Sequence, residues 1–224
     1  MTLLRMTADI RRTIPTIKSL ATLKSSTPRL IAAHTHIFRA AWNAASVLPV
    51  MANKFYRFGP PEAIITGSAP PYWWLYVAEK KITSVYEAQF CKNEPAFPGT
   101  FYLDPFAEKK GLIATIDFPT DLTLLDMIGD VLFQLGIFDQ ISSPDHAWCQ
   151  WFGNQLVKAK LFQAGKAFDG ILYPSRKNRS ENAIALFSGF VDKYRGKIKH
   201  ATQKFNTTEK YTTLRSMPFC KTAP

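Results

Sequence analysis

Two apolar spacings alternate along the middle of the chain and predict a mixture of strands and helices. Short runs rich in aromatic and branched residues indicate strands, whereas apolar residues spaced three or four apart indicate helices. This pattern predicts strands at 37–42, 54–58, 70–78, 111–118, 168–175 and 182–187. It predicts helices at 82–90 and 122–136, and a further helix starting at Ser143-Pro144-Asp145. The elements alternate irregularly, without clear βαβ units or an internal repeat.

The helix expected after residue 143 has the strongest local signals. Ser143 offers a hydroxyl N-cap, Pro144 suits the first turn, and Asp145 adds an acid there. One apolar face follows, made by Trp148, Trp151, Phe152 and Leu156. We expect Trp73, Trp74, Trp148 and Trp151 to lie in the core, with a partner interface as the alternative. In the helix expected at 122–136, Gly129 is a weak point.

The basic excess of the chain lies at its two ends. The net charge is +11, of which residues 1–29 carry +5 and residues 190–224 carry +6, so the central 14 basic and 14 acidic residues cancel. A nucleic-acid-binding domain more often carries a basic stripe on its body. Direct nucleic-acid binding is therefore not expected, although basic tails can also bind an acidic partner.

Each end of the chain has its own composition. Residues 1–29 are rich in Ser, Thr, Lys and Arg, which is the composition of a transit peptide. They have no continuous apolar region, so a secretory signal is not expected. We favour a short amphipathic helix that breaks near Pro15 and packs against the body. Beyond residue 190 the chain is polar and basic, and we expect a partly ordered extension.

Composition bounds the class of protein. The 224 residues, 46% hydrophobic and 20% charged, are enough to bury a core in one globular domain. No run approaches 18 uninterrupted apolar residues, so no membrane span is expected. The odd number of separated cysteines (Cys91, Cys149, Cys220) supports neither a disulfide framework nor a zinc site. A reducing, cytoplasmic location follows as the default expectation.

Common motifs of catalysis are missing from the sequence. It has no GxGxxG after a strand, no P-loop, no HExxH and no GxSxG. His34 and His36 form an H-x-H pair without a nearby ligand cluster, so we expect a structural or solvated role and no metal site. His146 lies close to Cys149, but a Cys/His dyad usually joins separate elements, and we do not expect one here.

A few polar residues stand within apolar surroundings and are candidates for chemistry. Arg57 lies in KFYRFGPP, Tyr76 and Glu87 lie in LYVAEKKITSVYEAQF, and Ser175 ends FDGILYPS. Each alone has an ordinary structural explanation as a surface cation, a solvated helix residue or a turn residue. Their combination is more specific than any one of them.

Together these positions resemble the RES-domain family, named for an arginine, a glutamate and a serine. The family pattern is matched by Arg39 in IFRAAW, Arg57 in YRF, Tyr76 in LYVAE, and Glu87 eleven residues after Tyr76. The late block is matched by Asp169, Gly170, Tyr173, Ser175 and Asn182 in FDGILYPSRKNRSENAIALF. The resemblance covers roughly residues 36–188. It departs at 56–71, where YRF and GPPEAIITGSAPP replace the usual Gly-Arg-Trp and short polar stretch.

The resemblance implies a fold, an activity and a partner. The fold is α+β, with an ADP-ribosyltransferase-like split β-sheet core flanked by helices around an NAD cleft. The expected organisation is a basic N-terminal extension at 1–35, the RES domain at 36–189 and a basic C-terminal extension at 190–224. Family members are toxins of toxin–antitoxin pairs that deplete NAD+ by breaking its nicotinamide–ribose bond. The implied partner is an antitoxin with a helix-turn-helix DNA-binding domain.

Residue roles follow from the same resemblance. Glu87, Arg57 and Ser175 are the expected catalytic residues, with Glu87 stabilising positive charge on the ribose. Arg39, Tyr76 and Asn182 are the expected NAD-binding residues, because an arginine grips phosphates and a tyrosine can stack on nicotinamide. NAD+ is the substrate, and neither a cofactor nor a metal ion is expected.

Two other functions remain open at this stage. An ADP-ribosyltransferase that modifies a cellular protein would use the same cleft and would need an acceptor-docking surface. A non-enzymatic binding module, or an unrelated basic protein, is the third possibility, although the joint presence of Arg57, Glu87 and Ser175 disfavours it. The acceptor could be water, phosphate or a protein.

Overall fold

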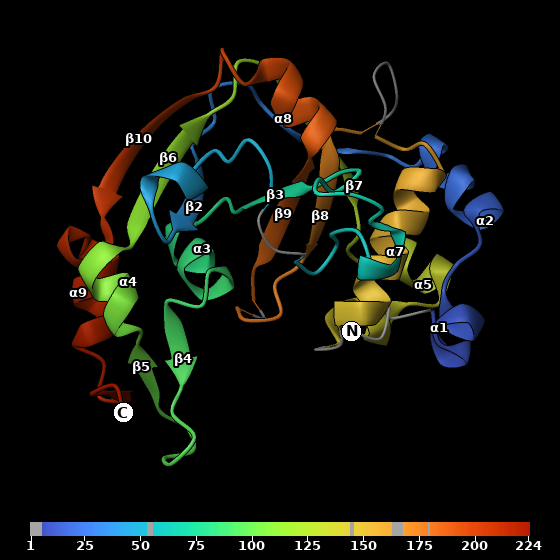
Figure 1. Ribbon diagram of the computed structural model, residues 1–224. Helices are drawn as coiled ribbons and strands as arrows, with labels where there is room; N and C mark the ends of the chain where they lie inside the picture. The colour runs from blue at the N-terminus through green and yellow to red at the C-terminus, as the bar shows by residue number, and fades with distance from the viewer. Residues whose placement is uncertain (1–5, 53–55, 144–145, 163–167, 179) are drawn as a thin grey trace.

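A computed structural model describes residues 6–52, 56–143, 146–162, 168–178 and 180–224 (Figure 1). Its strands are β1 (Arg29–Ile31), β2 (Ile37–Ala41), β3 (Trp74–Val77), β4 (Cys91–Asn93), β5 (Phe101–Leu103), β6 (Leu112–Asp117), β7 (Leu122–Asp126), β8 (Gly170–Pro174), β9 (Asn182–Phe187), β10 (Lys199–Lys204) and β11 (Cys220–Lys221). Its α-helices are α1 (Ala8–Thr13), α2 (Ile17–Ala21), α3 (Lys81–Glu87), α4 (Pro105–Lys110), α5 (Asp130–Leu135), α6 (Phe138–Ser142), α7 (His146–Lys158), α8 (Ser188–Tyr194) and α9 (Glu209–Arg215).

Two sheets share the core of the described residues. One has five strands in the order β1-β7-β8-β9-β3, antiparallel except for the parallel pair β7–β8. The other has three antiparallel strands in the order β10-β6-β2. The two sheets meet where Phe38 on β2 and Ala78 after β3 exchange backbone hydrogen bonds of 2.8 Å. The expected α+β fold is confirmed, and its core is divided between two sheets as the resemblance implies.

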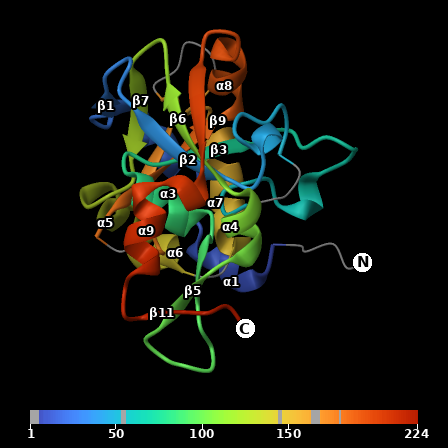
Figure 2. The ribbon, with the colours of Figure 1, turned by 90° about the vertical axis from the view of Figure 1, so that its left-hand side faces the viewer.

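The five-stranded sheet is buried on both faces because its side chains alternate between two apolar clusters. Ile171 and Tyr173 of β8 point to the cluster that contains α7, whereas Leu172 points to the cluster shared with the three-stranded sheet. Figure 1 shows α7, α5 and α2 on one side of this sheet and β2, β6 and β10 on the other. A third sheet, β11-β5-β4, lies at the lower end of the molecule (Figure 2).

Most of the expected elements are confirmed. Strands β2, β3, β6, β8 and β9 fall within the predicted runs, and helix α3 begins one residue before the predicted helix and ends at Glu87. Helix α7 follows the predicted capping sequence, of which Pro144 and Asp145 lie outside the described residues. Trp73, Trp74 and Trp148 are buried in the core, and Trp151 packs against it half-buried.

Two predictions about single elements are wrong. The helix expected at 122–136 is strand β7 followed by helix α5, and Gly129 separates them with a φ of 67°. Such a backbone favours glycine, which explains why the chain changes direction there. The strand expected at 54–58 is not formed in its described part, because residues 56–58 lie in a turn closed by a hydrogen bond from Gly59 N–H to the Tyr56 carbonyl. Lys54 and Phe55 lie outside the described residues.

The N-terminal segment packs against the body as expected. Helices α1 and α2 are separated at Pro15, and Ile10 and Leu20 are buried against α7 and its neighbours. The indole N–H of Trp148 donates to the Thr13 hydroxyl at 3.1 Å, which ties α1 to α7.

The C-terminal segment is more ordered than the sequence pattern indicates. Strand β10 pairs with β6 along its whole length, from Lys199 opposite Asp117 to Lys204 opposite Leu112. Phe205 and Leu214 are fully buried in a third apolar cluster with Phe90 of the body. The expectation of a partly ordered extension is therefore wrong, and the expected boundary at residue 190 falls inside α8.

None of the described helices has the length and apolar character needed to span a membrane.

Candidate active site

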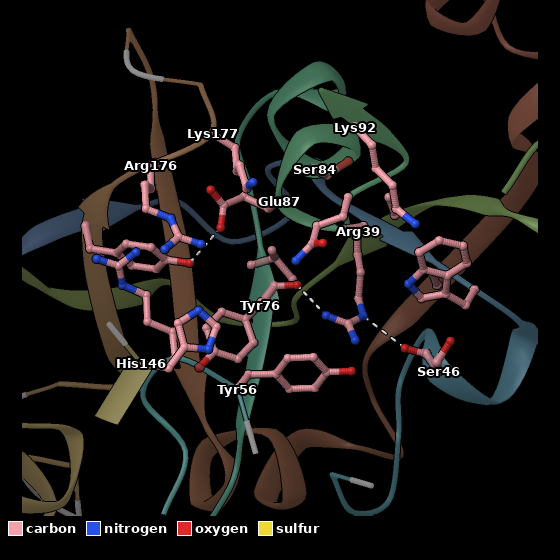
Figure 3. Close-up of a pocket in the computed structure, with 18 residues that line it drawn as sticks. Arg39, Ser46, Tyr56, Tyr76, Ser84, Glu87, Lys92, His146, Arg176 and Lys177 are labelled. Carbon is pink, nitrogen blue, oxygen red and sulfur yellow. Dashed lines mark hydrogen bonds between the residues drawn. The ribbon is translucent and has the colours of Figure 1, made fainter. Parts of the chain in front are cut away.

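A cleft of about 490 Å³ opens where the two sheets meet (Figure 3). It is bordered by β2, by the turn at 56–57, by β3, by the C-terminal half of α3, by the end of β8 and by the start of α7. The polar and charged side chains that line it are Arg39, Trp42, Ser46, Tyr56, Arg57, Tyr76, Ser84, Glu87, Gln89, Lys92, His146, Tyr173, Arg176 and Lys177. Segments distant in sequence thus contribute to one surface.

Glu87, the last residue of α3, is held in the cleft by two hydroxyl groups. The Ser175 hydroxyl donates to Glu87 Oε1 at 2.6 Å, and the Tyr173 hydroxyl donates to Oε2 at 3.3 Å. Ser175 and Tyr173 flank Pro174 at the end of β8, and both are buried. Burial raises the pKa of Tyr173 well above its ordinary value, and the charge of Glu87 raises it further, so this hydroxyl stays a donor. Both carboxylate oxygens of Glu87 therefore have fixed directions.

Arg57 is a buried cation without a hydrogen-bond partner for two of its nitrogens. The residue is 7% exposed, and its Nε and Nη2 atoms are unpartnered among the described residues. Its guanidinium carbon lies 5.7 Å from the centre of the Phe58 ring, a cation–π distance. A buried cation with unpaired N–H donors destabilises the fold unless an anion binds to it. The geometry therefore favours a negatively charged ligand in the cleft.

Arg39 and Tyr76 line the cleft, and backbone contacts fix both of them. Arg39 on β2 donates from Nε to the Ser46 carbonyl at 2.9 Å and from Nη1 to the Tyr76 carbonyl at 2.6 Å, as Figure 3 shows. Burial lowers the pKa of Arg39 to about 10, against the raising influence of Tyr56 and Tyr76. The Tyr76 hydroxyl accepts the Phe58 N–H at 2.9 Å, and burial raises its pKa. Tyr76 thus holds the turn that carries Arg57.

The cleft is strongly cationic. Arg39, Arg57, Lys92, Arg176 and Lys177 line it, and Glu87 is its one carboxylate among the described lining residues. Lys92 is paired with Asp104 at 2.7 Å, and Arg176 donates to the Ser143 carbonyl at 3.5 Å. Such a lining attracts an anionic molecule, and the Glu87 carboxylate is the one negative group of the described lining that would face that molecule.

The expected site residues are brought together, with one exception. Arg39, Arg57, Tyr76 and Glu87 line the cleft, and Ser175 contacts Glu87 directly. Asn182 begins β9 opposite Pro174 and is absent from the described lining. Asp169 of the same sequence block bonds to β7 instead, since its carboxylate accepts the Thr123 N–H at 2.9 Å. Gly170 leaves room for β9, because a Cβ there would lie 2.4 Å from the Ala185 carbonyl oxygen.

Several lining residues were missed from the sequence. Arg176 and Lys177 directly follow Ser175, so their place beside the site could have been found from that adjacency. His146 lines the cleft at the start of α7, while no pattern in the sequence marked Tyr56 or Lys92. His34 lies elsewhere on the surface, where the Nδ1 of its exposed side chain contacts the Asp117 carboxylate at 2.9 Å, which agrees with the expected structural or solvated role. No group of His, Cys, Asp and Glu suited to a metal ion is found in the described ranges.

The fold and the cleft define a small α+β domain that presents one oriented carboxylate in a cationic, partly buried site. The sequence matches the RES domain over residues 31–207, so the chain belongs to the RES-domain family. This match extends past both ends of the domain expected at 36–189.

One solved structure has the same fold at low sequence identity. It is the MbcT toxin in the crystal structure of the M. tuberculosis MbcT–MbcA toxin–antitoxin complex, with 16% identity and a TM-score of 0.54. The similarity covers 89% of this chain and 98% of that chain. None of the curated proteins matches this chain.

Proposed function

We propose that this protein is the toxin of a toxin–antitoxin pair and that it breaks the nicotinamide–ribose bond of NAD+. The observation that carries the proposal is Glu87, a carboxylate oriented by Ser175 and Tyr173 within an otherwise cationic cleft. Membership of the RES-domain family and the fold shared with the MbcT toxin support it.

Glu87 suits the chemistry of this bond. As the bond between ribose C1′ and the nicotinamide nitrogen breaks, its electron pair leaves with nicotinamide and positive charge develops on the ribose ring. A preorganised carboxylate beside that charge stabilises the transition state without having to reorient. Water or phosphate then supplies an oxygen to C1′, and with water a proton is released to solvent. Nicotinamide leaves as a neutral molecule, so the step requires little acid catalysis.

The cationic residues suit the rest of the substrate. NAD+ carries two phosphate groups, and the guanidinium fork of arginine binds phosphates through paired hydrogen bonds. Arg57 lines the cleft and its buried Nε and Nη2 are not tied to any described backbone carbonyl, whereas Arg39 has committed its Nε and Nη1 to backbone carbonyls. We therefore assign phosphate binding mainly to Arg57, with Arg39 holding the β2–β3 wall of the cleft. Asn182 is not assigned to NAD+ binding.

The partner in this proposal is an antitoxin that binds DNA through a helix-turn-helix domain. The MbcT chain was solved in complex with the antitoxin MbcA. The high positive charge of this chain, +11 in total, would complement an acidic surface on such a partner.

Nicotinamide release from NAD+ by purified protein tests the proposal. The Glu87→Gln variant keeps an oxygen that can accept from Ser175 but removes the charge, and should lower the rate about 100-fold or more. Glu209→Gln, which removes an exposed carboxylate at the start of α9, is the matched control and should retain full activity. Equal rates for the native protein and Glu87→Gln would refute the role of Glu87.

The same assay identifies the acceptor. Reactions with and without phosphate separate phosphorolysis from hydrolysis by the product, ADP-ribose 1″-phosphate or ADP-ribose. Label transferred from NAD+ to a protein, without release of free ADP-ribose, would instead support an ADP-ribosyltransferase. Absence of nicotinamide release without phosphate, with phosphate and with a protein acceptor would refute the proposed function.

A further inference from the structure

Described residues of the loop between β8 and β9 contact helix α3 at two points and its N-cap residue, Lys80, at a third. Ser175 contacts Glu87, Asn178 contacts Thr83, and Glu181 forms an ion pair with Lys80. Thr83 and Glu87 are four residues apart and lie on the same face of α3, and Lys80 directly precedes the helix at its N-terminal end. The loop and the helix are therefore joined at three points rather than at the catalytic pair alone.

The direction of the Ser175 hydroxyl is set by Asn178. The backbone N–H of Asn178 donates to Ser175 Oγ at 2.9 Å. An N–H group can only donate, so Ser175 must accept there, and its own proton is left for Glu87 Oε1. The hydroxyl proton of Ser175 is thus directed to the Glu87 carboxylate by the backbone of the loop.

The side chain of Asn178 fixes that backbone against α3. Its Nδ2 donates to the Thr83 hydroxyl at 3.2 Å, and its Oδ1 accepts from the Ser180 hydroxyl at 3.3 Å. Thr83 is fully buried and stands one turn before Glu87. The loop is also closed on itself, since Ser175 N–H donates to the Glu181 carbonyl and Glu181 N–H donates to the Asn178 carbonyl, both at 2.9 Å.

We propose that Asn178, anchored on Thr83, is a positioning residue that aligns Ser175 with Glu87 for cleavage of the nicotinamide–ribose bond. The inference rests on the proposed function and extends it to two residues outside the cleft lining. Asn178 acts through Ser175 and does not contact the substrate. Asn178 in the loop, rather than Asn182 at the start of β9, is the asparagine assigned to the site.

Kinetics of nicotinamide release test this role through a matched pair of variants. Thr83→Val removes the hydroxyl and keeps the shape, whereas Thr83→Ser keeps the hydroxyl. Thr83→Val and Asn178→Ala should each lower kcat about tenfold, the factor given by about 1.4 kcal/mol of lost transition-state stabilisation. KM for NAD+ should stay within about twofold, and Thr83→Ser should retain most of kcat. The control is Thr202→Val on the exposed strand β10, for which kcat and KM should equal the native values.

A double-variant experiment separates positioning from general support of the fold. If Asn178 acts through Ser175, then Asn178→Ala should lower kcat by less than about twofold in a Ser175→Ala background. If Asn178→Ala lowers kcat by the same factor with and without Ser175→Ala, the proposal is overturned. A native value of kcat in Thr83→Val would also overturn it. Should the native protein release no nicotinamide, the proposed function fails and amide hydrogen exchange decides the positioning role. Faster exchange of the Asn178 N–H in Thr83→Val but not in Thr83→Ser supports the anchor, and equal exchange in both overturns it.

Discussion

Gly153 lies where helix α7 meets the turn that carries Arg57, and its replacement by alanine should disturb both stability and the site. Gly153 is buried in the middle of α7. A Cβ at this position would lie 2.4 Å from the carbonyl oxygen of Phe58 and 3.1 Å from its carbonyl carbon. Ordinary van der Waals contact begins at 3.4 Å, so helix and turn must separate by the difference, about 1 Å.

Two opposing contributions determine the size of the effect. Alanine favours a helix interior over glycine by about 1 kcal/mol. Overpacking a tight contact costs about 1–3 kcal/mol. The upper end applies here because Phe58 cannot move freely. Its ring is fully buried, 5.0 Å from the ring of Tyr173, and its N–H is bonded to the Tyr76 hydroxyl. The net loss in unfolding free energy should be about 2 kcal/mol, or about 4–8 °C in Tm for a chain of this length.

Thermal and urea denaturation of Gly153→Ala measure this loss. Gly196→Ala is the control, since a Cβ there meets no atom within 4 Å, and its stability should stay within about 0.5 kcal/mol of the native value. Because the turn must move, KM for NAD+ should also rise in Gly153→Ala. A Gly153→Ala protein as stable as the native one would show that α7 does not approach Phe58 this closely.

Two further substitutions test the charges of the molecule. Arg57→Met removes a buried guanidinium whose Nε and Nη2 atoms have no partner in the described part of the chain. The unfolding free energy should therefore rise by about 1–3 kcal/mol, while nicotinamide release is lost. A variant less stable than the native protein would contradict this. Burial would raise the pKa of Asp104, but hydrogen bonds from Lys92 and the Ala107 and Phe106 N–H groups hold it below its ordinary 3.8. A carboxyl group with a lowered pKa in the folded state contributes stability that is present above pH 3.8 and is lost as the pH falls through the folded-state pKa. Asp104→Asn should therefore flatten the acid side of the profile of unfolding free energy against pH, measured by urea titration. An unchanged profile would refute the pairing of Asp104 with Lys92.

The sequence predicts best those strands whose apolar pattern is simple. Strands β2, β6, β8 and β9 are buried on one or both faces, and their short apolar runs stand out from polar neighbours. The apolar pattern predicts a helix in place of strand β7 because Leu122, Leu124 and Leu125 fit both the helical and the strand period. Only the backbone conformation at Gly129 separates β7 from α5. Strand β10 is exposed at every position, so it has no apolar alternation to detect.

The site was predictable only in part, because contacts between distant residues leave no local pattern in the sequence. Glu87 and Ser175 were identified through the resemblance to the RES-domain family, and no local pattern shows that residues 88 positions apart form a hydrogen bond. Arg57 falls within the strand expected at 54–58, yet it lies in a turn held by the Tyr76 hydroxyl and by α7. Tyr56 and Lys92 reach the cleft through tertiary packing, which leaves no trace in spacing along the chain.

The pairing of strands also sets the order in which the cleft can assemble during synthesis. Strand β3 pairs with β9, β2 pairs with β6, and β6 in turn pairs with β10 near the end of the chain. A ribosome-bound chain that has released α3 but not β8 therefore holds Glu87 without Ser175. Contacts between distant segments form slowly and late. The cleft should therefore stay incomplete through most of translation, until β8, Ser175 and the strand β9 that pairs with β8 have left the ribosome.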